Sequence, residues 1–244
     1  MTDKVWLNNN DYSPLNIICD FDGTISPFDS TDMVLSRFAI PQWEEVEAQW
    51  VAGQITAQEC MSQQISMLRT DEQLLNRFLD TIPLTKGFEE FVAFVENCGI
   101  GLKIVSDGLD YVICRVLANH GLHDIPFMAN HLKFTDNGFV LEFPHSRPNC
   151  ISGVCKCAVA ANVCGKTILI GDGRSDHCLA NKAELVLAKS GQSLERHCHK
   201  NGLPYASYNI FYDVISFFEK NFNKLCFNGF NQNLPQSGHA PKAL

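Results

Sequence analysis

The sequence predicts an α/β fold, a doubly wound parallel sheet with a small helical cap inserted after the first strand. Short apolar runs alternate with segments of helical periodicity, which is typical of a sheet with helices on both faces. Three of the runs end directly in polar turns that contain glycine, with the sequences DFDGT, SDG and GDGRSD. In an open α/β sheet, such turns lie along one edge, where ligands bind.

The first apolar run ends in Asp20 and Asp22, which are separated by a single residue. Gly23 lets the backbone turn at this point, so that both carboxylates can face one pocket. Two carboxylates this close repel each other, and a bound cation relieves the repulsion. Oxygen ligands favour Mg²⁺. The alternative is that the two aspartates only cap the helix that follows.

Residues 29–83 are predicted to form the helical cap. Apolar side chains recur there at helical spacing, as in Leu74, Leu75 and Phe78, and no segment resembles a strand. An insertion directly after the first acidic turn lies over the edge of the sheet and can act as a lid. In this cap, Asp29 and Asp32 either face the substrate or begin the first helix. Two arginines either receive a substrate carboxylate or pair with nearby acids: Arg37 and Arg69.

The core is predicted to comprise residues 12–28 and 84–222, and residues 223–244 a disordered tail rich in Asn, Gln, Pro and Gly. Helical periodicity predicts core helices over residues 88–98, 109–119, 154–163, 176–183, 194–201 and 211–222. Apolar runs predict strands over residues 102–105, 167–170 and 185–188. The segments 127–134 and 139–143, on either side of Asp136-Asn137-Gly138, are typical of a β-hairpin.

Composition and charge exclude several classes of function. The net charge of −8 argues against a nucleic-acid partner, because a phosphate backbone attracts a basic surface. No apolar run is long enough to span a bilayer, and residues 1–10 lack the pattern of a signal peptide. We therefore expect a cytoplasmic protein that binds neither nucleic acid nor membrane. The 11 cysteines, an odd number spread over strands and helices, are typical of reduced thiols.

The polar turns together supply the groups of a phosphoryl-transfer site. Four carboxylates in the first and third turns suit a hard divalent cation: Asp20, Asp22, Asp172 and Asp176. Ser106, Lys156 and the N–H groups of the loops suit an oxyanion such as phosphate. A metal, a phosphate site and a free carboxylate indicate chemistry in which the carboxylate takes the phosphoryl group and loses it to water.

The order of these motifs, DxDGT, a serine after an apolar strand, a lysine and then GDGxxD, resembles the four motifs of the haloacid dehalogenase (HAD) superfamily. The helical insertion is similar to the small cap of its phosphoserine phosphatase-like branch, and the resemblance covers residues 15–220. It implies a HAD-like, Rossmann-type core. Within this branch, CDFDGTI, GFEEFVAF and Pro144-His145-Ser146 are similar to the 2-hydroxy-3-keto-5-methylthiopentenyl-1-phosphate phosphatases of methionine salvage.

The resemblance implies a role for each residue of the site. Asp20 would be the nucleophile that forms an aspartyl-phosphate, and Asp22 the general acid for the leaving alcohol and then the base for water. Mg²⁺ would be held by Asp20, the backbone carbonyl of Asp22 and Asp172, with Asp176 as a direct or indirect partner. The phosphoryl group would be held by Thr24, Ser106, Lys156 and the N–H groups of Phe21 and Asp107.

The expected function is hydrolysis of a small phosphorylated metabolite, with the methionine-salvage ester as the candidate. A phosphoserine, phosphocholine or phosphoethanolamine phosphatase, a phosphoryl transferase, and a metal- or phosphate-binding regulator are the alternatives. The glutamate that phosphoserine phosphatases usually carry shortly after the first motif has no match here. The run Cys150-x4-Cys155-Lys156-Cys157 also resembles the phosphocholine and phosphoethanolamine phosphatases. These cysteines either bind zinc or are structural thiols, and their spacing favours thiols.

Overall fold

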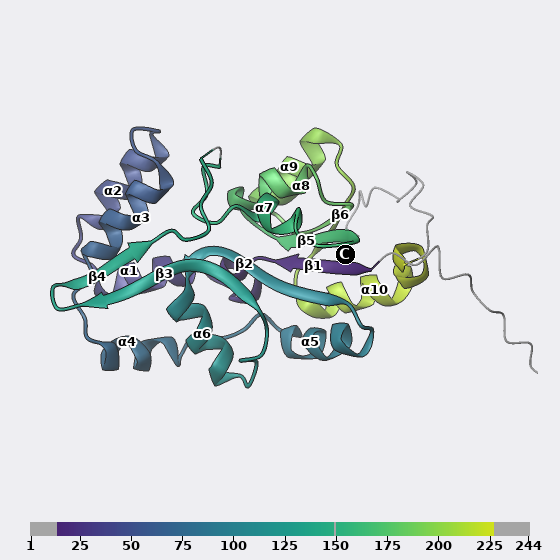
Figure 1. The fold of residues 1–244 in the computed structure, drawn as a ribbon, viewed down its shortest axis with the longest axis horizontal. Coiled ribbons are helices and arrows are strands. Elements are labelled where there is room, and N and C mark those ends of the chain that lie inside the picture. Colours follow the sequence, from purple (N-terminus) through teal and green to yellow (C-terminus); the bar gives the residue numbers. More distant parts are fainter. Residues whose placement is uncertain (1–13, 149, 227–244) are drawn as a thin grey trace, which may run out of the picture.

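The computed structural model describes residues 14–148 and 150–226. Its seven strands form one sheet in the order β4-β3-β2-β1-β5-β6-β7 (Figure 1). The strands are β1 (Leu15–Cys19), β2 (Gly101–Leu109), β3 (Phe127–Thr135), β4 (Gly138–Glu142), β5 (Lys166–Gly171), β6 (Leu185–Lys189) and β7 (Tyr205–Tyr208). Neighbouring strands are parallel, except for the antiparallel hairpin of β3 and β4. The predicted doubly wound α/β fold is confirmed.

Helices cover both faces of the sheet (Figure 1). One face carries α5 (Phe88–Asn97), α6 (Asp110–Asn119) and α10 (Phe211–Cys226), and the other carries α7 (Lys156–Ala160), α8 (His177–Ala180) and α9 (Ser193–Asn201). The side chains of β1 alternate between these layers, since Ile17 and Cys19 belong to the first core and Ile18 to the second. Burial on both faces explains why the strands are continuous apolar runs.

Four buried phenylalanines tie α5 to α10 and are called the phenylalanine layer below: Phe88, Phe91, Phe211 and Phe218. The ring centroids of Phe88 and Phe211 are 4.9 Å apart, and those of Phe91 and Phe211 are 5.1 Å apart. These distances are typical of favourable aromatic contacts. The apolar spacing that predicts the helix at residues 88–98 therefore reflects one packed face.

The insertion after β1 forms four helices, α1 (Ser30–Phe38), α2 (Trp43–Val51), α3 (Ala57–Ser66) and α4 (Glu72–Leu79). Side-chain caps begin three of them, from Asp29, Thr56 and Asp71. In Figure 1, α4 lies beside the core helix α6, and the Arg115 guanidinium contacts the Asp80 carboxylate at 2.7 Å. The division of the chain into cap and core at residues 29 and 84 stays a prediction.

The structure differs from the expected elements at several places. Helices α7 and α8 are shorter than the helices predicted over residues 154–163 and 176–183. Strand β7 was not predicted, because its four residues obtain their pairing from β6 rather than from a local pattern. Strand β2 continues beyond residue 105 to Leu109, through an irregularity in its pairing with β3. Helix α10 runs to Cys226, so the predicted tail from residue 223 begins too early; Leu225 is buried against the core. Residues 227–244 lie outside the described range.

Candidate active site

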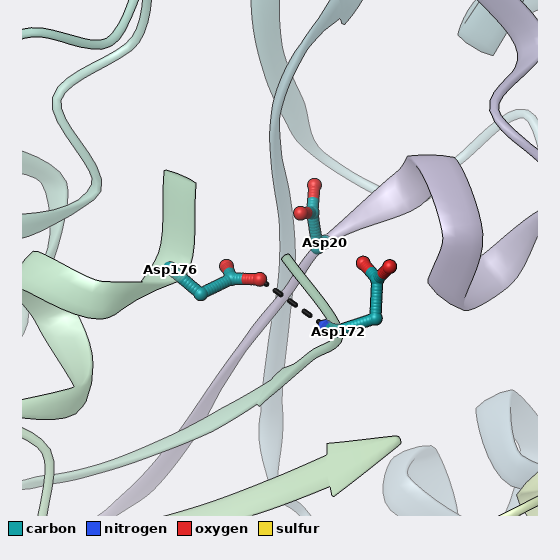
Figure 2. Close-up of side chains that lie close together, drawn as sticks. All are labelled: Asp20, Asp172 and Asp176. Atoms are coloured by element: carbon teal, nitrogen blue, oxygen red, sulfur yellow. Dashed lines mark hydrogen bonds between the residues drawn. The ribbon is translucent and has the colours of Figure 1, made fainter. Parts of the chain in front are cut away.

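The site lies at the carboxyl ends of β1 and β5, the two central strands from which the chain proceeds in opposite directions across the sheet. Asp20 directly follows β1, and its N–H donates to the Ile170 carbonyl at 2.9 Å. Asp172 directly follows β5. Three carboxylates, from Asp20, Asp172 and Asp176, offer oxygens that all lie within 4.8 Å of one another (Figure 2). The sheet thus brings together residues that are 152 positions apart, from 20 to 172.

The residues that connect Asp20 to Thr24, here called the acidic turn, have a backbone that requires glycine. Asp22 has φ −68° and ψ 133°, and Gly23 has φ 70° and ψ −9°, which are the angles of a type II turn. A Cβ atom at Gly23 would lie 2.4 Å from Asp172 Oδ2. Glycine therefore serves both the left-handed angle and the close approach of Asp172.

Lys156 is the cation of this cluster and is fully buried at the start of α7. Its ammonium contacts Asp20 Oδ2 at 2.7 Å and Asp176 Oδ1 at 2.5 Å, and donates to Ser175 Oγ at 3.1 Å. Burial lowers the pKa of Lys156, but the carboxylates of Asp176 and Asp20 outweigh burial and raise the pKa above its usual value. The buried ammonium therefore stays charged.

Asp176 is held through both of its carboxylate oxygens. Oδ1 contacts Lys156, and Oδ2 accepts the N–H groups of Asp172 at 3.2 Å and of Gly173 at 3.1 Å (Figure 2). A Cβ atom at Gly171 would lie 2.3 Å from Asp176 Oδ2, so glycine is needed at the end of β5 as well. These contacts fix the loop that carries Asp172, which makes Asp176 an anchor of the site.

Burial raises the pKa of Asp20 to about 7, although Lys156 opposes this rise. Burial also raises the pKa of Asp172 to about 6, and the neighbouring Asp20 adds to the effect. Three carboxylates lie together beside one buried ammonium, so the ionised cluster holds more negative charge than Lys156 neutralises. An all-oxygen donor set with excess negative charge fits a hard divalent cation such as Mg²⁺.

Asp22 does not belong to this group of three carboxylates and is held by Ser30 instead. Its Oδ1 accepts the N–H of Ser30 at 2.7 Å and also the Ser30 hydroxyl. A Cβ atom at Gly108 would lie 2.3 Å from Asp22 Oδ2 and 3.2 Å from Ser106 Oγ. The side chains of Asp22 and Ser106 therefore both lie close to Gly108. Burial, followed by the charge of Asp29, raises the pKa of Asp22 well above its usual value. A raised pKa favours the protonated form of the carboxyl group, which is the form that a general acid needs.

The last part of β2 is tied to the loop that precedes Lys156. The buried Ser106 hydroxyl accepts the N–H of Gly108 at 3.0 Å. Asp107 uses its carboxylate to accept the N–H of Val154 at 2.8 Å, and its carbonyl accepts the side-chain amide of Asn130 at 2.5 Å. The Asp107 side chain therefore organises the Lys156 loop, and its N–H remains the group proposed for phosphate.

Thr24 is fully buried and contacts the cluster at Asp172. Its hydroxyl donates to Asp172 Oδ1 at 3.3 Å, and its carbonyl accepts the Thr85 hydroxyl at 2.7 Å. The structure thus places Thr24 against a proposed metal ligand, and its proposed contact with phosphate stays untested.

Three residues of the site were not singled out by the sequence. Ser175 donates to Asp20 Oδ2 at 3.4 Å, and its place inside GDGRSD was the available signal. Lys189 donates to the Gly23 carbonyl at 2.5 Å, and its place directly after a predicted strand was a weaker signal. Asn130 lies in β3 of the predicted hairpin, and no sequence pattern distinguishes it.

A family model for haloacid dehalogenase-like hydrolases matches residues 17–181. The chain belongs to this family. A curated relative from Geobacillus thermodenitrificans, a 2-hydroxy-3-keto-5-methylthiopentenyl-1-phosphate phosphatase, is 31% identical over 84% of this chain and 96% of its own. A relative of the same name from an Exiguobacterium species is 31% identical over 83% of this chain and 96% of its own. The sequence-based assignment to the HAD superfamily is confirmed.

Solved structures agree with the fold of this HAD-like hydrolase. A phosphoserine phosphohydrolase-like protein from Francisella tularensis superposes with a TM-score of 0.62 at 23% identity, over 83% of this chain and 99% of the other. A phosphoserine phosphatase structure, described as a phospho-aspartyl intermediate analogue, superposes with a TM-score of 0.63 at 20% identity, over 84% of this chain and 99% of the other. At this identity, the likeness shows the fold alone.

The structure shows the contacts of the cap residues whose roles the sequence left open. Asp29 Oδ1 accepts the N–H of Asp32 at 2.9 Å, so Asp29 begins α1. Arg69 lies beyond the end of α3 and donates to the carbonyls of Ser66, the last residue of that helix, and Leu68. The Arg37 guanidinium lies 5.9 Å from the Phe38 ring.

The cap also touches the GDGRSD turn directly. The Arg174 guanidinium lies 5.7 Å from the ring of Trp50, near the end of α2. This cation–π contact joins the cap to the loop between Asp172 and Asp176.

The cysteines show no metal site in the part of the chain that the structure describes. There, the His, Cys, Asp and Glu side chains close enough to share an ion are the three aspartates named above. Ten cysteines within this part are free thiols, including Cys150, Cys155 and Cys157. Within the same residues, no helix combines the length and the apolar character needed to cross a membrane.

Proposed function

We propose that this HAD-like hydrolase is a Mg²⁺-dependent phosphomonoesterase that works through an aspartyl-phosphate on Asp20. The observation that carries the proposal is the cluster at the carboxyl ends of β1 and β5, where Asp20 lies between the buried Lys156 ammonium and Asp172. The expectation of a phosphoric monoester hydrolase agrees with the phosphatase names of the curated relatives. An all-oxygen cluster and a single buried ammonium suit phosphate chemistry.

Asp20 and Asp22 have different roles in the proposed reaction. A carboxylate oxygen of Asp20 attacks phosphorus, and the bond from phosphorus to the leaving oxygen breaks. Asp22 gives its proton to that oxygen, then takes a proton from water, which attacks the aspartyl-phosphate and releases inorganic phosphate and free Asp20. Asp20, Asp172 and the Asp22 carbonyl would hold Mg²⁺, which would supply positive charge to offset that of the phosphoryl group.

The remaining groups orient the phosphate and the nucleophile. Lys156 holds Asp20 through a charged hydrogen bond, which directs the carboxylate and offsets charge between it and the phosphoryl group. Ser106 and the N–H groups of the loops donate to the phosphoryl oxygens. The high pKa of Asp22 supports its role, because the group must carry a proton when the ester oxygen leaves.

The proposed substrate is a small phosphorylated metabolite, with 2-hydroxy-3-keto-5-methylthiopentenyl-1-phosphate as the candidate. Both curated relatives described above carry this activity in their names and match nearly their whole length. The predicted cap contacts the GDGRSD turn through Trp50 and Arg174, and a cap that closes over the site would favour a small substrate. A cytoplasmic location and the absence of nucleic-acid and membrane partners stay predictions from the sequence.

Phosphate release from a panel of small phosphate esters tests the proposal. With Mg²⁺, wild-type protein is expected to release phosphate and to prefer the methylthiopentenyl ester over phosphoserine and phosphocholine. Asp20→Asn, which keeps the shape but removes the nucleophile, is expected to lose turnover by at least about 10³-fold. Asp124→Asn is the matched control, since Asp124 is 92% exposed and far from the cluster in sequence and fold.

Each other result has a distinct meaning. Preference for phosphoserine or phosphocholine keeps the phosphatase but replaces its substrate. Phosphate transfer to added alcohols in place of water indicates a transferase. Mg²⁺ binding without release from any ester indicates a regulator and overturns the proposed enzyme.

A further inference from the structure

Lys189 lies beside the site although it belongs to none of the four motifs. It is the last residue of β6, the strand next to β5. In the register of these strands, Gly171 pairs with Ala188, so Lys189 is level with the first residue of the loop, Asp172. Parallel strands end at one edge of the sheet, which brings the side chain of Lys189 to the edge that carries the acidic turn.

The Lys189 ammonium reaches that turn directly. Its Nζ donates to the Gly23 carbonyl at 2.5 Å, across 166 positions of the sequence. Lys189 is half-buried, so ordering its long side chain has a cost that the contact must offset. A charged donor on a carbonyl oxygen is among the stronger hydrogen bonds of a protein.

Gly23 is therefore confined from two sides. On one side, a Cβ atom would overlap Asp172 Oδ2 at 2.4 Å, which shows how closely the two residues approach. On the other side, Lys189 holds the carbonyl. The peptide just before Gly23 carries the Asp22 carbonyl, a proposed metal ligand. The position of Gly23 thus sets the distance between that carbonyl and the Asp172 carboxylate.

Lys156 and Lys189 hold different parts of the site. Lys156 is occupied by Asp20, Asp176 and Ser175, all on the side of the nucleophile. Among the described residues, Lys189 is the ammonium whose contact lies on the acidic turn itself. Lys189 donates its hydrogen bond to the backbone of the turn, and its charge also interacts with the Asp172 carboxylate.

We propose that Lys189 is a positioning residue that holds the acidic turn against Asp172, so that the Asp22 carbonyl and the Asp172 carboxylate meet on one cation. The proposal rests on the phosphatase function proposed above. Groups that orient metal ligands commonly contribute about 10- to 100-fold to metal affinity or activity.

The test compares three variants. Lys189→Met removes the ammonium and keeps the length of the side chain, and Lys189→Arg keeps the charge and a donor. Lys166→Met is the matched control, because the Lys166 ammonium also donates to a backbone carbonyl, that of Leu225 at 3.0 Å, at the opposite end of the sheet. Mg²⁺ affinity is measured from the rise of the melting temperature with Mg²⁺ concentration, which requires no turnover.

For Lys189→Met, a positioning role and a purely electrostatic role predict opposite changes in Mg²⁺ affinity. Removing a positive charge near the site tightens Mg²⁺ binding if only Coulomb forces act. If Lys189 holds the turn, Lys189→Met weakens Mg²⁺ binding by about tenfold and lowers kcat by a similar factor, with KM near the wild-type value. Lys189→Arg recovers most of both losses, and Lys166→Met changes neither.

Unchanged or tighter Mg²⁺ binding in Lys189→Met overturns the proposal, as does an equal loss in Lys166→Met. If Lys189→Met does not fold, Lys189→Gln takes its place: it removes the charge and shortens the side chain, and unchanged Mg²⁺ affinity in this variant overturns the proposal as well. A wild-type protein that binds Mg²⁺ but releases no phosphate overturns the proposed function, and the Mg²⁺ titrations still test Lys189.

Discussion

The phenylalanine layer on one face of the sheet and the acidic cluster at its edge are both buried, but different forces stabilise them. The hydrophobic effect that stabilises Phe88, Phe91 and Phe211 is not directional. Their contribution to the free energy of unfolding grows with the apolar area that they remove from water. Lys156 and Asp176 are equally buried, yet each is stable only while its partners stay within hydrogen-bond distance. The first region tolerates substitution in proportion to lost volume, whereas the second fails when one member is removed.

The largest effect is expected at the centre of the cluster. Lys156→Met leaves the Asp20 and Asp176 carboxylates buried without their cation, which costs about 3–5 kcal/mol of unfolding free energy and abolishes turnover. Denaturant unfolding and phosphate release measure the two losses. Lys133→Met is the control, since its pair with Glu142 is half exposed and contributes less than about 1 kcal/mol. Retained turnover in Lys156→Met contradicts the assigned role.

The phenylalanine layer is expected to separate stability from chemistry. Phe91→Ala removes a fully buried ring and costs about 3–5 kcal/mol of unfolding free energy. Because the ring lies away from the acidic edge, kcat and Mg²⁺ affinity stay at the wild-type values at temperatures where the variant is folded. A large loss of Mg²⁺ affinity in the folded variant contradicts this separation.

A pH dependence sharpens the contrast further. In the folded protein without metal, the pKa of Asp20 is about 7 and that of Asp172 about 6, against 3.8 for an ordinary aspartate. Between pH 4 and 7, Asp20 and Asp172 therefore keep protons in the folded state that they release in the unfolded state. As a result, their contribution to the free energy of unfolding falls as pH rises. Mg²⁺ favours the ionised carboxylates, so its stabilising effect grows over the same range.

The measurement is the melting temperature with and without Mg²⁺ at pH 5.5 and pH 7.5, for wild type and Asp172→Asn. The Mg²⁺-dependent increase is expected to be larger at pH 7.5 in wild type, and small at both pH values in the variant. An increase that is larger at pH 5.5 contradicts the proposed ligand set.

The smallest effect is expected where the cap meets the acidic edge. Trp50→Leu removes the ring beside the Arg174 guanidinium and costs about 0.5–1 kcal/mol of unfolding free energy, as expected for an exposed cation–π contact. A double-mutant cycle with Arg174→Met isolates the pair. A coupling free energy indistinguishable from zero shows that the contact between Trp50 and Arg174 does not stabilise the protein.

The parts of the molecule that were predictable from the sequence follow local rules. Asp20 and Asp172 come directly after apolar strands, and parallel strands end at one edge, so their meeting follows from the pattern. The apolar spacing of residues 88–98 predicts α5, because one face of that helix is buried.

The parts that were missed depend on contacts between distant segments. Strand β7 has four residues and forms on the edge of β6, and α10 continues to Cys226 because Leu225 finds a buried place. Lys189 and Asn130 donate to backbone carbonyls that are 166 and 23 positions away. No local pattern encodes such pairs, which arise only when the sheet has assembled.

The central claim is that Asp20 carries the phosphoryl group during turnover. The most direct measurement is an acid quench of the Mg²⁺-loaded enzyme reacting with a phosphate-labelled ester, followed by mapping of the labelled peptide. Covalent label on the peptide that contains Asp20, more abundant in Asp22→Asn and absent in Asp20→Asn, is the result expected. Phosphate release by the wild type without label on that peptide contradicts the aspartyl-phosphate mechanism.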